Sequence, residues 1–168
     1  MSIGALKLIS RDLADGTVHS NSTDEAVLAS YVFPANFFVS GKVIKFECAL
    51  EAPSTNGTDT LTIRVRFGPT TLTGTAVATS SAIDAANDDK CYISGTIIVR
   101  DADSSGTIIA AVMMNDPDAV GQATESYVAE VSSLDFTAAQ RLEVTADWSV
   151  AHADNDVNSL FLLVYEAV

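Results

Sequence analysis

The clearest pattern in the 168-residue chain is an alternation of apolar and polar residues over positions 141–150. The apolar set is Leu142, Val144, Ala146, Trp148 and Val150, and the polar set is Arg141, Glu143, Thr145, Asp147 and Ser149. A period of two is typical of a strand with one buried face, so we expect the only tryptophan in the core. The charged face of this strand is predicted to pair with Lys45 and Glu47 of a neighbouring strand.

Similar apolar patterns predict further strands, and no segment has a helical period. The predicted strands cover residues 22–33, 42–51, 60–68, 90–100, 106–114, 127–136 and 158–168, with a short one at 76–79. Residues 115–126 are expected to form a polar loop, and residues 137–140 a single helical turn. About eight strands with long connections predict an all-β, jelly-roll-like β-sandwich.

The first 22 residues mix apolar and charged positions with neither period. We predict that residues 1–22 form either an N-terminal arm, which would lie on a neighbouring subunit, or an irregular edge strand. Residues 23–168 then form the β-sandwich domain.

Two predicted strands are apolar on both faces. In the last one, Leu160, Leu162 and Val164 share one face, while the opposite face is also apolar. A strand of this kind needs something to cover its second face. The candidate subunit interface comprises Phe161, Leu163, Tyr165, Ile109 and Met113. The alternative is that both strands are central and covered by the chain's own loops.

Composition and charge narrow the possible partners. The chain is 48% hydrophobic and only 18% charged, which indicates an ordered domain. Nine Lys and Arg residues against 22 Asp and Glu residues give a net charge of −13. This charge disfavours nucleic acid and anionic membranes as partners. No apolar run is long enough to span a membrane, and the N-terminus lacks an export signal, so we expect synthesis and assembly in a cytoplasm.

Residue patterns that support catalysis are not evident. His19 and His152 are far apart in the sequence and lack metal-site spacing, and no nucleophile elbow or glycine-rich phosphate loop occurs. Asp154 and Asp156 crowd a turn that could offer oxygen ligands to Ca²⁺, although Asp is also an ordinary turn residue. We therefore expect no enzyme activity, no cofactor and no metal.

The two cysteines, Cys48 and Cys91, occupy apolar positions of predicted strands. We expect them to be buried as small apolar side chains. The sequence does not decide whether they form a disulfide, because strand pairing could bring them together.

Four segments together resemble the small β-sandwich proteins of tailed-bacteriophage virions. They are FPAN (33–36), TNGTDTLTIRVRFG (55–68), GTIIVRDADSSGTIIA (95–110) and LEVTADWSVAHADNDV (142–157). Proteins of this kind share an IPAN turn, an NGTDTLTLRLR strand and a late EVTAQW strand. The resemblance covers residues 23–166, and Phe33 stands where the turn usually has isoleucine.

Such domains occur as trimeric capsid decoration (cement) proteins and as heads of fibre or tail proteins. The resemblance therefore implies a structural virion protein that binds the major capsid protein on the capsid surface as a homotrimer and stabilises the shell. It would assemble in the host cytoplasm. The alternative is a fibre or tail head domain that binds a host receptor or glycan. An inward-facing Trp148 is unlike the exposed aromatic platform of a sugar site.

Overall fold

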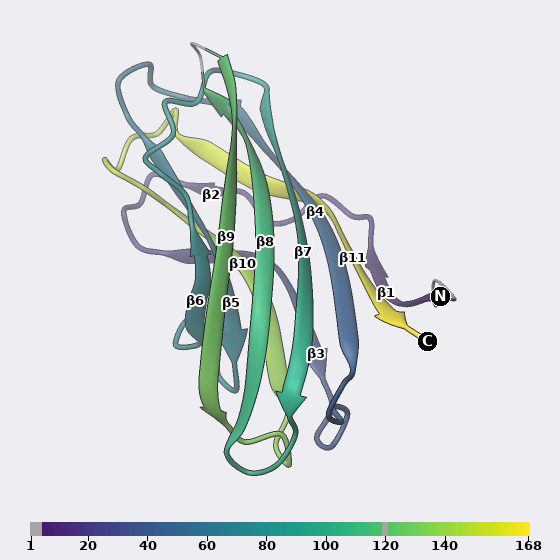
Figure 1. The fold of residues 1–168 in the computed structure, drawn as a ribbon. Helices are drawn as coiled ribbons and strands as arrows, with labels where there is room; N and C mark the ends of the chain where they lie inside the picture. Colours follow the sequence, from purple (N-terminus) through teal and green to yellow (C-terminus); the bar gives the residue numbers. More distant parts are fainter. Residues whose placement is uncertain (1–4, 119–120) are drawn as a thin grey trace.

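The computed structural model describes residues 5–118 and 121–168 and consists of two antiparallel sheets packed face to face (Figure 1). The larger sheet has the order β1-β11-β4-β7-β8-β9, with β2 also paired to β11, and the smaller has the order β3-β10-β5-β6. The strands are β1 (Leu6–Asp12), β2 (His19–Ser20), β3 (Ala26–Phe33), β4 (Val43–Ser54), β5 (Leu61–Gly68), β6 (Thr75–Thr79), β7 (Asp89–Asp101), β8 (Gly106–Asp118), β9 (Gly121–Leu134), β10 (Gln140–Trp148) and β11 (Asp156–Ala167). The all-β sandwich prediction is confirmed.

The strand order contains a jelly roll with an added hairpin. One half of the jelly roll is β1-β11-β4-β7 and the other is β3-β10-β5-β6. The hairpin β8–β9 follows β7 and widens the larger sheet. The eleven strands exceed the predicted count of about eight, mainly because the N-terminal region contributes β1 and β2.

The hairpin also corrects the predicted loop at 115–126. β8 extends to Asp118 and β9 begins at Gly121, so most of this segment is paired strand; residues 119–120 lie outside the described residues. The segment is rich in Asn, Asp and Pro, which are poor strand formers. Cross-strand pairing overrides this local preference.

The predicted helical turn at 137–140 is wrong as well. The backbone N–H of Ala138 bonds to the Asp135 carbonyl at 3.2 Å, and the N–H of Thr137 bonds to Asp135 Oδ1 at 3.0 Å. The Asp135 side chain therefore stabilises a simple turn, a common role for aspartate. Strand β10 begins directly afterwards, at Gln140.

The tryptophan strand is confirmed on its inner face and corrected elsewhere. Trp148 is buried in the core with the three apolar residues that precede it in the alternation. Val150 is instead 47% exposed, because β10 ends at Trp148. The predicted pairing with Lys45 and Glu47 is wrong, since both lie on β4 in the other sheet. The actual neighbours of β10 are β3 and β5.

The N-terminal segment runs along the outer edge of β11. β1 pairs with the end of β11, β2 pairs with its beginning, and between them the Gly16 N–H bonds to the Ser159 carbonyl at 2.7 Å. The register shifts between Leu8 and Ser10, which breaks the alternation of side chains. This bulge explains why the sequence shows no clear period there.

The core lies between the two sheets. Cys48 and Cys91 are buried on its β4 and β7 walls and form no disulfide. Cys48 pairs with Ile93 and Cys91 with Leu50, so the cysteines are diagonal rather than directly opposite. Burial raises the pKa of the Cys48 thiol, and the neighbouring Cys91 raises it further.

Candidate functional site

The outer face of the large sheet, which points away from the core, carries its side chains in rows across the strands. Directly opposite residues in antiparallel strands share a face, so the pairing register defines these rows. One middle row is Leu8, Tyr165, Lys45, Thr96, Ala111 and Val128. The next is Arg11, Leu163, Glu47, Ser94, Met113 and Ser126.

A groove of about 490 Å³ crosses the strands along these two rows, and we call it the outer-face groove. The side chains over its centre are short: Ser94 and Thr96 on β7 and Ala111 on β8. Gly95 lies between them and lets Phe46 pack closely beneath, because a Cβ at Gly95 would lie 2.3 Å from the Phe46 ring. The groove thus forms because the side chains in the middle of these rows are shorter than those at the ends.

The ends of the groove are bulkier. Leu6 and Tyr165 line one end, where β1 and β11 meet, and Met113 and Val128 line the other, on the added hairpin. Val128 is 79% exposed and Met113 is 52% exposed. The β8–β9 hairpin therefore supplies one wall of the groove, and the strands of the jelly roll alone would not form this wall.

All five predicted interface residues lie on this outer face. Phe161, Leu163 and Tyr165 are half-buried on β11, and Ile109 and Met113 are on β8. Both strands are central, since β11 lies between β1 and β4 and β8 lies between β7 and β9. The smaller sheet does not cover β8 or β11 on this outer face, because it packs against the inner face of the larger sheet. Contact with another subunit stays a prediction.

Polar groups gather near the centre of the outer face. Burial raises the pKa of Tyr92, and the negative charge of the nearby Glu47 carboxylate raises it further. Lys45 is exposed in the adjacent row, next to Tyr165. The charges of the paired rows nearly balance, in contrast to the net charge of −13 of the whole chain: they are Arg11, Lys45 and Lys90 against Glu47, Glu51, Asp101 and Glu130.

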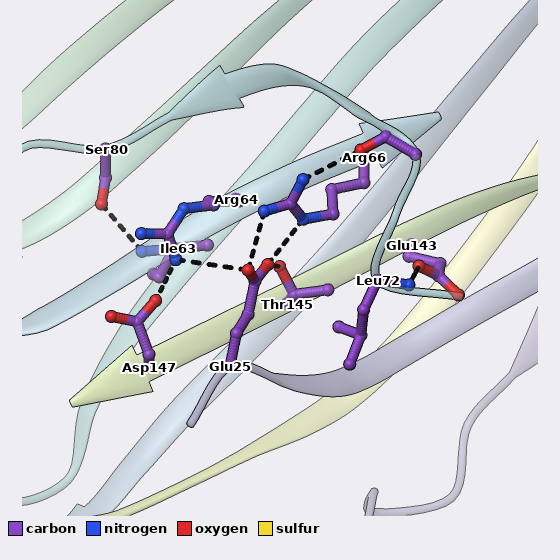
Figure 2. Close-up of polar contacts among 10 residues, drawn as sticks. Glu25, Ile63, Arg64, Arg66, Leu72, Ser80, Glu143, Thr145 and Asp147 are labelled. Carbon is purple, nitrogen blue, oxygen red and sulfur yellow. Dashed lines mark hydrogen bonds and ion pairs between the residues drawn. The ribbon is translucent and has the colours of Figure 1, made fainter. Parts of the chain in front are cut away.

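The outer face of the small sheet has a different chemistry (Figure 2). The Arg66 guanidinium donates to both Glu25 oxygens, at 2.6 and 2.7 Å, and to the Gly74 carbonyl at 2.9 Å. Arg64 pairs with Asp147 and lies 3.9 Å from a Glu25 oxygen. We call these residues, with Thr145, which donates to Glu25, the arginine network.

The loop between β5 and β6, residues 69–74, packs beside the arginine network. Glu143 is only 2% exposed, and one of its oxygens accepts a hydrogen bond from the Leu72 N–H at 2.9 Å. Burial alone would raise the pKa of Glu25, but hydrogen bonds from Arg66 and Thr145 and the charges of both arginines lower it overall. The charged groups of this face are thus held mainly by each other. This network was not predicted, because it depends on which strands become neighbours.

The histidines and the acidic turn that the sequence analysis considered as possible metal sites lie in turns and at a strand, where hydrogen bonds stabilise the local structure. In the turn after β10, the buried Asn155 donates to Asp59 at 2.8 Å and accepts from the Asn56 N–H at 2.8 Å, which ties two loops together. His152 Nδ1 accepts from the Asp154 N–H at 3.1 Å, and His19 lies in β2. Over residues 5–118 and 121–168, no group of three or more His, Cys, Asp or Glu side chains is placed to hold a metal ion. The same residues contain no helix with the length and apolarity needed to cross a membrane.

Comparisons with known proteins give only distant likenesses. No model of a protein family and no curated protein matches the sequence. A solved structure of the infectious bursal disease virus Gx strain has a TM-score of 0.40 at 14% identity, covering 99% of this chain and 32% of that one. The chain thus spans about a third of that protein's length.

Two further solved structures are similar at the same low level. The lectin UEA-II complexed with galactose has a TM-score of 0.36 at 10% identity, covering 76% of this chain and 73% of that one. The CBM2 module of the Lactobacillus casei BL23 phage J-1 evolved Dit has a TM-score of 0.33 at 13% identity, covering 83% and 69%. None of these likenesses decides what the chain does.

Proposed function

We propose that the chain is a structural protein of a tailed-bacteriophage virion, and specifically a decoration protein that binds the outer capsid shell as a homo-oligomer. The observation that carries this proposal is the outer face of the large sheet. It leaves bulky apolar side chains exposed, whereas the outer face of the small sheet is closed by its own ion pairs. An exposed apolar surface on an ordered domain is typical of a contact surface.

The segments that resemble phage virion proteins support the same proposal. They fall on the end of β3, on β5, on the β7–β8 hairpin and on β10, which all build the sandwich. A protein of this kind stabilises a shell by burying surface that would have to separate before the shell opens. Many copies multiply a modest contact energy.

The proposed contacts between subunits include Phe161 and Leu163 on β11. Tyr165, Ile109 and Met113 are the other candidates on the same face. The three-fold order comes from the resemblance alone. The N-terminal segment, with its exposed leucines, is the proposed contact with the major capsid protein.

The test is the composition and structure of purified virions of the phage that encodes the chain. We expect mass spectrometry to find the chain in the particles, and cryo-electron microscopy to show its density on the outside of the capsid. Absence of the chain from purified particles would overturn the virion proposal. Density at the tail alone would replace decoration with the fibre or tail head role.

The fibre or tail head role is the second candidate, and the outer-face groove favours it. Serine and threonine hydroxyls, a lysine and a glutamate converge in the groove, as they do in sites for polar ligands. A head domain would use such a site on a host receptor or glycan.

A further inference from the structure

The outer-face groove combines a size, a lining and an orientation that together indicate one class of ligand. Its volume of about 490 Å³ is within the range of about 300–1,000 Å³ found for ligand sites. It crosses the strands instead of following an edge, and it is open to solvent at the exposed Met113 and Val128. A ligand that fills it lies extended across the sheet.

The backbone within the groove is already used. β4, β7, β8 and β9 pair continuously through this region, so their N–H and C=O groups bond to each other. An extended peptide gains most of its affinity by pairing with free backbone at a sheet edge. A ligand on this face must be recognised by side chains, which disfavours a peptide strand.

The side chains of the groove suit a ligand with many hydroxyl groups. Ser94, Thr96 and Ser126 each offer a hydroxyl that both donates and accepts, Lys45 donates, and Glu47 accepts. Tyr165 adds an aromatic ring with a polar tip at one end of the groove. We propose that the outer-face groove binds a short stretch of an uncharged glycan chain, with Lys45, Glu47, Ser94 and Thr96 contacting sugar hydroxyls and Tyr165 packing against a sugar ring.

The centre of the groove distinguishes this ligand from a second copy of the chain. The core of a protein–protein contact is depleted of charged residues, with the polar groups at the rim. Here the arrangement differs: Lys45 and Glu47 lie within the groove, beside the hydroxyl groups at its centre, and the exposed Val128 and Met113 lie at one end. Subunit contacts are better placed at Phe161, Leu163 and Ile109, which do not line the groove.

The inference does not rest on the virion role, so it is tested with the purified chain. The probes are maltotriose, cellotriose and chitotriose in ligand-observed saturation-transfer NMR, together with an array of bacterial surface oligosaccharides. Ala111→Arg places a long side chain into the groove from an exposed position, and Thr124→Arg, exposed on the same face outside the groove, is the matched control. Thr96→Ala removes one hydroxyl without adding bulk.

We expect at least one probe to bind, Ala111→Arg to weaken that binding by about tenfold or more, and Thr96→Ala to weaken it several-fold. Thr124→Arg should leave it within about twofold. Two results would overturn the proposal: no probe binds at millimolar concentration, or Ala111→Arg binds as well as the unchanged chain. If Ala111→Arg instead turns an oligomer into a monomer and no glycan binds, the groove belongs to a second copy.

Discussion

The outer faces of the two sheets differ in how their side chains are bound: ion pairs cover the small sheet, and a groove with exposed side chains crosses the large sheet. On the small sheet, Arg64 and Arg66 are bound by Glu25 and Asp147, and a loop covers Glu143. On the large sheet, small and apolar outer side chains are mixed with a few charged ones, and a groove crosses them. Both faces consist of the outward-pointing residues of alternating strands. On the small sheet the charged groups form a network of ion pairs, whereas on the large sheet the ion pair of Lys90 with Glu51 lies outside the groove.

The difference separates structure from function. Side chains of a closed network are held by each other, so substitutions there mainly change stability. Side chains of an open face contribute little to folding and are available to a partner. We therefore expect substitutions on the small sheet to change the free energy of unfolding, and substitutions on the large sheet to change assembly or binding.

The largest expected effect is that of Arg66→Ala in the arginine network. It removes the guanidinium that donates hydrogen bonds to both Glu25 oxygens. The negative charge of that partly buried carboxylate then lacks its main partner. We expect the free energy of unfolding to fall by about 2–4 kcal/mol in urea denaturation. Arg100→Ala, at an exposed position of β7, is the control and should change it by less than about 0.5 kcal/mol. Equal losses in the two variants would remove the contrast between the faces.

A smaller effect follows from the lowered pKa of Glu25. Because this pKa lies below its ordinary value of 4.5, the charged carboxylate stabilises the fold above pH 4.5, and the contribution is lost as the pH falls through the lowered pKa. We expect part of the free energy of unfolding to disappear as the pH falls from about 5 into the acid range below 4.5. The measurement is urea unfolding over this pH range. Glu25→Gln should be less stable at neutral pH and flatter in this range; an unchanged pH profile in that variant would assign the loss to other carboxylates.

Leu163→Ser tests the open face at the strand proposed for subunit contact. Leu163 is half-buried in the monomer, so we expect a stability loss of only about 1 kcal/mol. If it contributes to assembly, the mass from light scattering should fall towards the 17.6 kDa of a single chain. The matched control is Val32→Ser, an exposed apolar position on the small sheet, which should leave the mass unchanged. A single-chain mass in the unchanged protein would contradict the homo-oligomer.

The smallest expected effect is that of Val128→Lys on the added hairpin. This side chain is almost fully exposed, so the free energy of unfolding should change by less than about 0.5 kcal/mol. The same variant lies at the wall of the outer-face groove and should weaken the binding of any ligand there. A stability loss of more than 1 kcal/mol would mean that the open face also supports the fold.

The sequence was most informative where a strand has one buried side. The alternation up to Trp148, and those in the strands that became β4 and β5, identified the core residues correctly, and only Val150, beyond the end of β10, is exposed. It failed where pairing decides the outcome. The polar segment 115–126 became part of a long hairpin, and the outer side of β10 met arginines on β5 instead of Lys45 and Glu47 on β4.

The candidate site was predictable only in part. The two-faced apolar strands indicated Phe161, Leu163, Tyr165, Ile109 and Met113, and the structure places all five on one outer face. The groove between them gave no local signal. It arises because short side chains from β7, β8 and β9, distant in sequence, come side by side through the register.

The position of β11 has a consequence for synthesis on the ribosome. This strand lies inside the larger sheet, next to its edge, with β4 on one side and the N-terminal β1 and β2 on the other. Until it leaves the exit tunnel, the edge of β4 is open and the first strands have no partner. The hairpin β8–β9 joins neighbouring segments and can form earlier, since its contacts are local. The sandwich therefore closes only after residues 156–167 have left the ribosome, and a chain that stops before residue 156 lacks the strand that joins β1 to β4.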